Sequence, residues 1–157
     1  MSDKNRSVAF TLLGASNHTD KNRQEEDFYA THPVAMEKLL EREQFSSTVW
    51  EPAVGQGHLA EVLKNSGYEV ICSDIVDRGY CNTKVQDFLR TTVRPAKERV
   101  DIITNPPYKY AQEFVQHSLD ISLPETKIAM FLKIQFLEGG GSVQVIYGKP
   151  TKVRVCL

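Results

Sequence analysis

The sequence lacks several features that would assign it to a specialised class of protein. Its three cysteines, Cys72, Cys81 and Cys156, form neither a CxxC pair nor a cluster with histidines, so no metal site is predicted. An odd number of cysteines without such spacing favours reduced thiols and a cytoplasmic protein. The first ten residues, MSDKNRSVAF, lack the apolar core of a signal peptide. The most apolar run, KIAMFLKIQFL, is short and carries lysines, so no membrane-spanning helix is predicted.

A strong net charge is also missing. The 157 residues include 19 Lys and Arg against 20 Asp and Glu, for a formal net charge of −1. Composition therefore gives no bulk signature of nucleic-acid binding, although a local basic face can exist within a neutral total. The hydrophobic share of 41% and the charged share of 25% are ordinary for a soluble globular protein. The length suits one domain with a sizeable core.

The chain divides into a polar arm and one folded domain. Residues 1–26 are mostly polar and end in TDKNRQEE, which is typical of a loosely ordered amino-terminal arm. The domain is expected over residues 27–157, where apolar runs alternate with amphipathic stretches. We predict helices at 33–45, 57–67 and 110–122, and strands or short extended elements at 47–51, 68–74, 84–89, 100–104, 126–134 and 152–157. This alternation predicts an α/β fold with a mostly parallel sheet and helices on both faces.

Ligands of such sheets bind at the carboxyl ends of the strands, and the first predicted strand ends in EPAVGQG. Gly55 and Gly57 allow the backbone to pass close to a ligand, and the helix that follows offers free N–H groups. Glu51 distinguishes the motif, because a carboxylate there would repel a pyrophosphate but suit an ammonium or sulfonium group. An ordinary strand–turn–helix with glycines in its turn fits the same letters.

The second strand ends at Asp74, within VICSDIV. An acidic residue at this distance after a glycine loop typically accepts hydrogen bonds from two ribose hydroxyls. A solvated turn aspartate or a helix cap is the other interpretation.

The fourth predicted strand is followed by Asn105, Pro106, Pro107 and Tyr108. Proline has a fixed φ and no N–H, so this stretch is rigid and its carbonyls have little competition. The side-chain oxygen of Asn105 and the carbonyl of Pro106 can accept both hydrogens of a planar amino group. Tyr108 could stack on the ring that carries that group. A tight turn built on two prolines is the structural alternative.

The segments EPAVGQG, SDI, QDF and NPPY occur here in the order of class I S-adenosylmethionine-dependent methyltransferases. Over about residues 27–137 the chain resembles the amino-group branch of that family, especially adenine-specific DNA methyltransferases of the phage or orphan type. DFYATHP, residues 27–33, is similar to the family's amino-terminal cofactor motif. The resemblance implies a Rossmann-like sheet and methyl transfer from S-adenosylmethionine to the exocyclic amine of adenine in DNA.

The resemblance also implies roles for individual residues. The cofactor would be bound by Tyr29, Thr31, Glu51, Gly55, Gly57, Asp74, Ile75, Asp87 and Phe88. Within this set, Asp74 would hold the ribose hydroxyls, Ile75 would pack on the adenine ring, and Asp87 with Phe88 would read its edge. The catalytic residues would be Asn105, Pro106, Pro107 and Tyr108. Lone histidines such as His58 are interpreted as surface or packing residues, and no metal is implied.

The chain departs from the family pattern near its carboxyl end. GGGSVQVIYG stands where an amphipathic helix is expected, and glycine is a poor helix former. The chain stops at KVRVCL, so we expect the family's terminal strand hairpin to be shortened or missing, through truncation or an altered end. No separate target-recognition region is evident, so sequence recognition is expected to be weak or supplied by a partner.

Two further hypotheses remain open. NPPY also occurs in enzymes that methylate a glutamine side-chain amide or a guanine amine in ribosomal RNA, and the nearly neutral charge fits such substrates. A non-catalytic module that binds the cofactor without transferring its methyl group is the third hypothesis.

Overall fold

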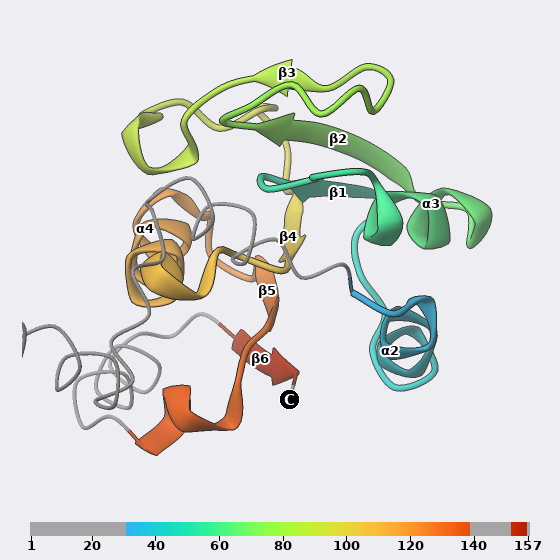
Figure 1. Cartoon of the computed structure of the whole chain (residues 1–157), viewed down its shortest axis with the longest axis vertical. Helices are drawn as coiled ribbons and strands as arrows, with labels where there is room; N and C mark the ends of the chain where they lie inside the picture. Colours follow the sequence, from blue (N-terminus) through green and yellow to red (C-terminus); the bar gives the residue numbers. More distant parts are fainter. Residues whose placement is uncertain (1–30, 139–151, 157) are drawn as a thin grey trace, which may run out of the picture.

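A six-stranded sheet with the strand order β3-β2-β1-β4-β5-β6 forms the centre of the structure (Figure 1). This computed structural model describes residues 31–138 and 152–156. The strands are β1 Thr48–Glu51, β2 Glu69–Asp74, β3 Lys84–Val85, β4 Asp101–Thr104, β5 Lys127–Phe131 and β6 Lys152–Cys156. Every pairing between these strands is parallel, so the predicted α/β class with a mostly parallel sheet is confirmed. The expectations for the polar arm, Tyr29 and GGGSVQVIYG lie outside the described residues.

Helices cover both faces of the sheet, as the sequence predicts. They are α2 Pro33–Leu40, α3 His58–Asn65 and α4 Ala111–Ile121, with short 3-10 helices η1 Phe88–Arg90, η2 Tyr108–Tyr110 and η3 Ile134–Glu138. Figure 1 shows α4 on one side of the strands and α2 with α3 on the other. Because successive side chains of a strand point to opposite faces, neighbouring residues enter different cores. Trp50 and Ile102 pack with α4, whereas Val49 and Ile103 pack with α2 and α3.

The start of α2 and the end of α3 follow from the sequence, and the end of α2 does not. Pro33 occupies the first turn of α2, and Gly67 follows α3 with a φ of 89° that favours glycine. The prediction that the first helix reaches residue 45 is wrong, because α2 ends at Leu40. Beyond it, the carbonyl of Gln44 accepts a hydrogen bond from Nζ of Lys127 on β5. This contact holds residue 44 beside the amino end of β5, outside the helix.

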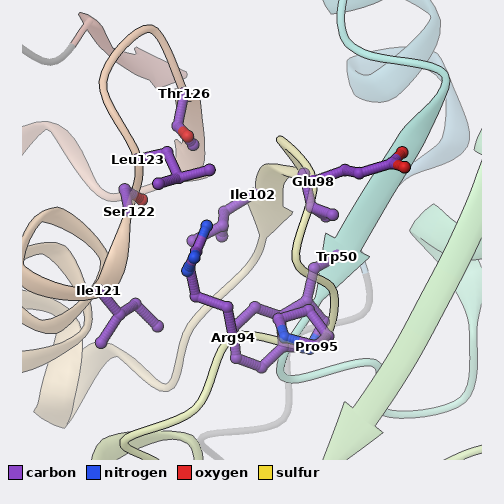
Figure 2. Close-up of a pocket in the computed structure, with 10 residues that line it drawn as sticks. Trp50, Arg94, Pro95, Glu98, Ile102, Ile121, Ser122, Leu123 and Thr126 are labelled. Atoms are coloured by element: carbon purple, nitrogen blue, oxygen red, sulfur yellow. The ribbon is translucent and has the colours of Figure 1, made fainter.

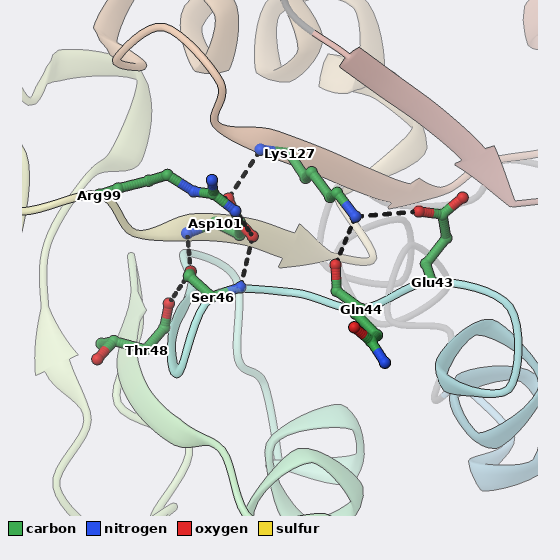
Figure 3. A network of polar contacts seen from close by, with 7 residues as sticks. All are labelled: Glu43, Gln44, Ser46, Thr48, Arg99, Asp101 and Lys127. Atoms are coloured by element: carbon green, nitrogen blue, oxygen red, sulfur yellow. Dashed lines mark hydrogen bonds and ion pairs between the residues drawn. The ribbon is translucent and has the colours of Figure 1, made fainter.

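The amino ends of the central strands are joined by a buried carboxylate (Figure 3). Asp101 at the start of β4 has no exposed surface. Its Oδ2 accepts the backbone N–H of Ser46 at 2.7 Å, and its Oδ1 accepts that of Lys127 at 2.8 Å. The guanidinium of Arg99 donates to both oxygens at 3.3 Å. The side chain therefore ties β4 to β5 and to the segment before β1.

Candidate functional site

A cavity of about 570 Å³ lies at the opposite, carboxyl ends of β1, β2 and β4. Its walls come from the segments that follow these three strands, from η1, from Phe114 of α4 and from Thr31. Since α3 and α4 lie on opposite faces, the chain after β1 and the chain after β4 turn away from each other at this edge. A crevice at such a point is where open α/β sheets bind ligands, and the volume falls in the range of small-molecule sites.

Glu51 is the most unusual residue of this cavity. Its side chain ends β1, is 2% exposed and lines the cavity. Burial raises the pKa of Glu51 well above its ordinary value, with a smaller contribution from Asp74, while a hydrogen bond to the backbone of Ala60 opposes the rise. Within the described part of the chain, Oε2 has no hydrogen-bond partner. A buried carboxylate oxygen without a donor is costly, so the position favours a ligand that brings a positive charge or N–H groups.

The two glycines that follow differ in their surroundings. Gly55 lines the cavity and has a φ of 58°, so it lets the backbone pass beside a ligand. Gly57 is the N-cap of α3, has a φ of 86° and lies outside the cavity lining. A Cβ atom built on Gly57 would overlap the ring of Tyr80. The second glycine is thus required by packing against another part of the same chain.

Asp74 lies where the sequence predicts it, at the end of β2 and on the cavity wall. Its Oδ2 accepts the N–H of Gly55 at 2.8 Å, and its Oδ1 accepts the N–H of Val76 at 3.0 Å. Each carboxylate oxygen can accept more than one hydrogen bond, so both retain capacity for ligand hydroxyls. The next residue, Ile75, is 62% exposed and lines the same wall, which makes it available to cover a flat ring.

Asp87 and Phe88 border the cavity from η1. Oδ1 of Asp87 accepts the N–H of Leu89 at 3.0 Å and so caps this short helix, while Oδ2 lies 3.4 Å from the guanidinium of Arg90. The ring of Phe88 is buried, with its centroid 5.1 Å from that of Trp50 and 4.8 Å from that of Phe114. Phe88 therefore anchors this wall to the core beneath α4.

The Asn-Pro-Pro-Tyr stretch is divided between the cavity and its surroundings. Asn105 and Pro107 line the cavity, whereas Pro106 is buried and is not among the lining residues. Tyr108 lies outside the lining, and Nζ of Lys133 sits 4.3 Å from the centre of its ring. Tyr110, which is 42% exposed, lines the cavity instead. Because η2 turns the chain here, the second tyrosine and not the first reaches the cavity.

Sequence reasoning missed several residues of the cavity wall. Tyr110 and Phe114 contribute apolar surface, and His58, Arg78 and Arg90 contribute polar groups. The sequence interpretation made His58 a surface or packing residue, yet it is the first residue of α3, follows the glycine loop directly and lines the cavity. Adjacency to the glycine loop and to the two prolines was the available signal for His58 and Tyr110.

A second cavity lies between the segment 94–100 and the end of α4 (Figure 2). It measures only about 10 Å³, which suits a single water molecule. Figure 2 shows the guanidinium of Arg94 directed toward Ser122 and Ile102. Nη1 of Arg94 and Oγ of Ser122 are buried and have no partner within the described residues. The size excludes a substrate, so the larger cavity is the candidate site.

Other types of site find no support among residues 31–138 and 152–156. No group of three His, Cys, Asp or Glu side chains in this part is arranged to hold a metal ion. Burial raises the pKa of the Cys72 thiol to about 11, so this cysteine is not a thiolate nucleophile near neutral pH. None of the described helices has the length and apolar character needed to cross a membrane. Comparisons with protein-family models, curated proteins and solved structures found no match.

Proposed function

We propose that the protein is a class I methyltransferase that binds S-adenosylmethionine in the large cavity and methylates the exocyclic amine of adenine, with DNA as the substrate. The observation that carries this proposal is the convergence of Glu51, Asp74 and Asn105 on one cavity. The three residues end β1, end β2 and follow β4, respectively. The cavity can therefore hold a cofactor, through a group that suits positive charge and a ribose acceptor, beside the amine that Asn105 would accept.

The strand order adds support for a Rossmann-like methyltransferase fold. The order β3-β2-β1-β4-β5-β6 is the one used by doubly wound nucleotide-binding sheets, whose ligands lie across the β1–β4 crevice. A resemblance limited to sheet order would fit many ligands, so the choice among them depends on the side chains at that crevice.

Glu51 favours a cationic cofactor over a dinucleotide. A pyrophosphate normally binds at the helix amino terminus that follows the first strand. Here the carboxyl group of Glu51 already has a hydrogen bond to the backbone of Ala60, in the first turn of α3. A phosphate at the same place would meet a buried acid, whereas an ammonium or sulfonium group would relieve the cost of ionising it.

The residues present fit S-adenosylmethionine, because an oxygen of Glu51 in the cavity has no partner within the described residues. When bound, the cofactor supplies an electrophilic methyl group on a positively charged sulfur. Glu51 and Thr31 would hold its amino-acid part, Asp74 its ribose, and Ile75 with Asp87 its adenine.

Asn105 and Pro106 would orient the acceptor amine. Their oxygens accept its two hydrogens, which favours a pyramidal nitrogen with its lone pair aimed at the methyl group. After accepting the methyl group, the nitrogen would release one of its two protons to water. Catalysis comes from alignment and from acceptors fixed in advance by the two prolines, so no nucleophilic side chain is needed.

Tyr110 is the better candidate for stacking on the acceptor ring. It borders the cavity beside Asn105 and Pro107, while the ring of Tyr108 is covered by Lys133. Lys109 lies 5.3 Å from the Tyr110 ring centre, so a cation accompanies each of these aromatic rings. Cations beside aromatic surface suit a nucleic acid, and a base in duplex DNA would have to leave its stack to reach this depth.

The test is methyl transfer from labelled S-adenosylmethionine to separate pools of unmethylated genomic DNA, RNA and protein, followed by nucleoside and amino-acid analysis. We expect N6-methyladenine in the DNA pool. Label in RNA or on glutamine would keep the chemistry and change the substrate. Cofactor binding without label in any pool would indicate a binding module, and no binding at all would refute the proposal.

A further inference from the structure

The segment between β2 and β3, residues 75–83, forms one wall of the large cavity. Ile75, Val76 and Arg78 of this segment line it and are more than one third exposed, so much of their surface does not pack on the core. Such a wall needs an anchor if it is to present a fixed surface to a ligand. Tyr80, two residues beyond Arg78, is the partly buried aromatic side chain of this segment.

Tyr80 contacts α3 through its hydroxyl and its ring. The hydroxyl donates to Oε1 of Glu61 at 2.6 Å and accepts from Nζ of Lys64 at 2.8 Å. The same ammonium lies 4.7 Å from the ring centre, in the range of a cation–π contact. Burial and the bond to Glu61 raise the pKa of Tyr80 to about 12, so the hydroxyl stays protonated and remains a donor.

The ring of Tyr80 also lies directly against the glycine loop. It packs on a small cluster of Val54, Ala60 and Cys72, and it fills the space that any side chain at residue 57 would need. Val54 lines the cavity, so the ring supports the loop from behind. One side chain therefore joins the wall formed by residues 75–78 to the loop that carries Gly55.

We propose that Tyr80 is a positioning residue, which clamps the segment 75–83 onto α3 and so fixes two walls of the ligand cavity. The clamp touches neither ligand nor reacting atoms. It lowers the disorder that ligand binding would otherwise have to remove, so its loss should weaken binding and leave the reaction of the bound complex unchanged. The inference rests on the proposed cofactor only for the choice of probe.

The experiment compares Tyr80→Phe and Tyr80→Ala with the control Tyr68→Phe. This control removes a hydroxyl from a tyrosine that packs on the core between the sheet, α2 and α3, away from the Tyr80 cluster. S-adenosylmethionine binding is measured by calorimetry, and the maximal methyl-transfer rate is measured at saturating cofactor. Losing the hydroxyl contacts should raise Kd about threefold or more, and losing the whole side chain should raise it about tenfold or more. The maximal rate should stay within about twofold of the original, as expected when only binding is affected. Tyr68→Phe should leave both quantities unchanged.

Hydrogen exchange of the free protein gives a second readout that needs no ligand. Residues 75–79 should exchange faster in both Tyr80 variants, while α4 keeps its protection. Unchanged exchange in residues 75–79, or unchanged Kd with a lower unfolding midpoint, would overturn the clamp and leave Tyr80 a purely structural residue. If Tyr80→Ala fails to fold, Tyr80→Phe decides the matter. A protein that binds no S-adenosylmethionine would refute the proposed function, and the exchange result would still test the clamp.

Discussion

The two ends of the sheet treat a buried carboxylate in opposite ways. At the amino end, both oxygens of Asp101 are satisfied by Ser46, Lys127 and Arg99 (Figure 3). At the carboxyl end, Glu51 is equally inaccessible, yet its Oε2 has no partner within the described residues and faces a large cavity. The same chemical group is thus fully hydrogen-bonded at one end of the sheet and has an oxygen without a partner among the described residues at the other.

This difference indicates that the carboxylate at the amino end contributes to stability and that the one at the carboxyl end contributes to ligand binding. A buried charge with complete hydrogen bonding holds secondary-structure elements together, and removing it leaves its hydrogen-bond donors buried without an acceptor. A buried carboxyl group with incomplete hydrogen bonding is a cost that the free protein carries and that a ligand can relieve. Substitutions at the two ends should therefore change different measured quantities.

The largest effect is expected at the amino end. Asp101→Asn replaces one acceptor oxygen by an amide that must face an N–H donor, and it removes the charge that Arg99 contacts. The free energy of unfolding should fall by about 3 kcal/mol or more, measured by urea denaturation. Glu37→Gln, on the exposed face of α2, is the control and should change it by less than about 0.5 kcal/mol. A small loss in Asp101→Asn would mean that the network does not hold the strands.

At the carboxyl end, Asn105→Ala should affect the reaction rather than the fold. The maximal methyl-transfer rate should fall about a hundredfold, or about 2.7 kcal/mol, because a fixed acceptor of the amine hydrogens is lost. Cofactor affinity should change far less. Asn65→Ala, at the exposed end of α3, serves as the matched control. Transfer at the original rate would leave the two prolines as only a rigid turn.

Tyr110→Ala tests which aromatic ring meets the acceptor. Loss of stacking should weaken DNA binding by about 1–3 kcal/mol and raise the KM for DNA accordingly. Tyr110→Phe keeps the ring and should leave this KM nearly unchanged. Tyr108→Ala is the comparison, and we expect a smaller change because this ring lies under Lys133 and outside the cavity lining. A larger effect from Tyr108→Ala would return the stacking role to Tyr108.

Glu51→Gln should weaken binding of the cationic cofactor about tenfold, since an amide cannot balance a positive charge. In the original protein the affinity should rise with pH, because the cation favours the ionised form of a carboxyl group whose pKa is raised when the cavity is empty. The affinity of the variant should lack this dependence. Calorimetry across the pH range tests both statements, with Glu113→Gln on the exposed face of α4 as control. A parallel pH dependence in the variant would remove Glu51 from the site.

The smallest effect concerns stability without ligand. The folded-state pKa of Glu51 exceeds its ordinary value, so unfolding releases a proton and stability falls as pH rises through that interval. The glutamine side chain of Glu51→Gln does not titrate, so the variant should lose less stability as pH rises. The difference in melting temperature, variant minus original, should therefore grow with pH. A constant difference would show that Glu51 is ionised at little cost.

Much of the fold follows from local pattern alone. The ends of β1, β2 and β4 at Glu51, Asp74 and Thr104 agree with the runs of apolar residues, and the inward positions of α4 agree with its helical spacing. These features depend on residues a few positions apart, where periodicity directly reports the conformation. The sequence alone therefore showed which residue types follow the strands, but not how those residues are arranged in space.

Contacts between distant segments decided the rest. Nζ of Lys127 donates to the carbonyl of Gln44 across a separation of 83 residues, and this contact accompanies the early end of α2. Tyr80 fills the space beside Gly57, and Tyr110 reaches the cavity where Tyr108 was expected. Local sequence determined which chemical groups this protein places at its strand ends. Strand order and packing determined which of those groups meet, because hydrogen bonds and side-chain contacts act over a few ångströms and only the folded chain brings remote residues that close.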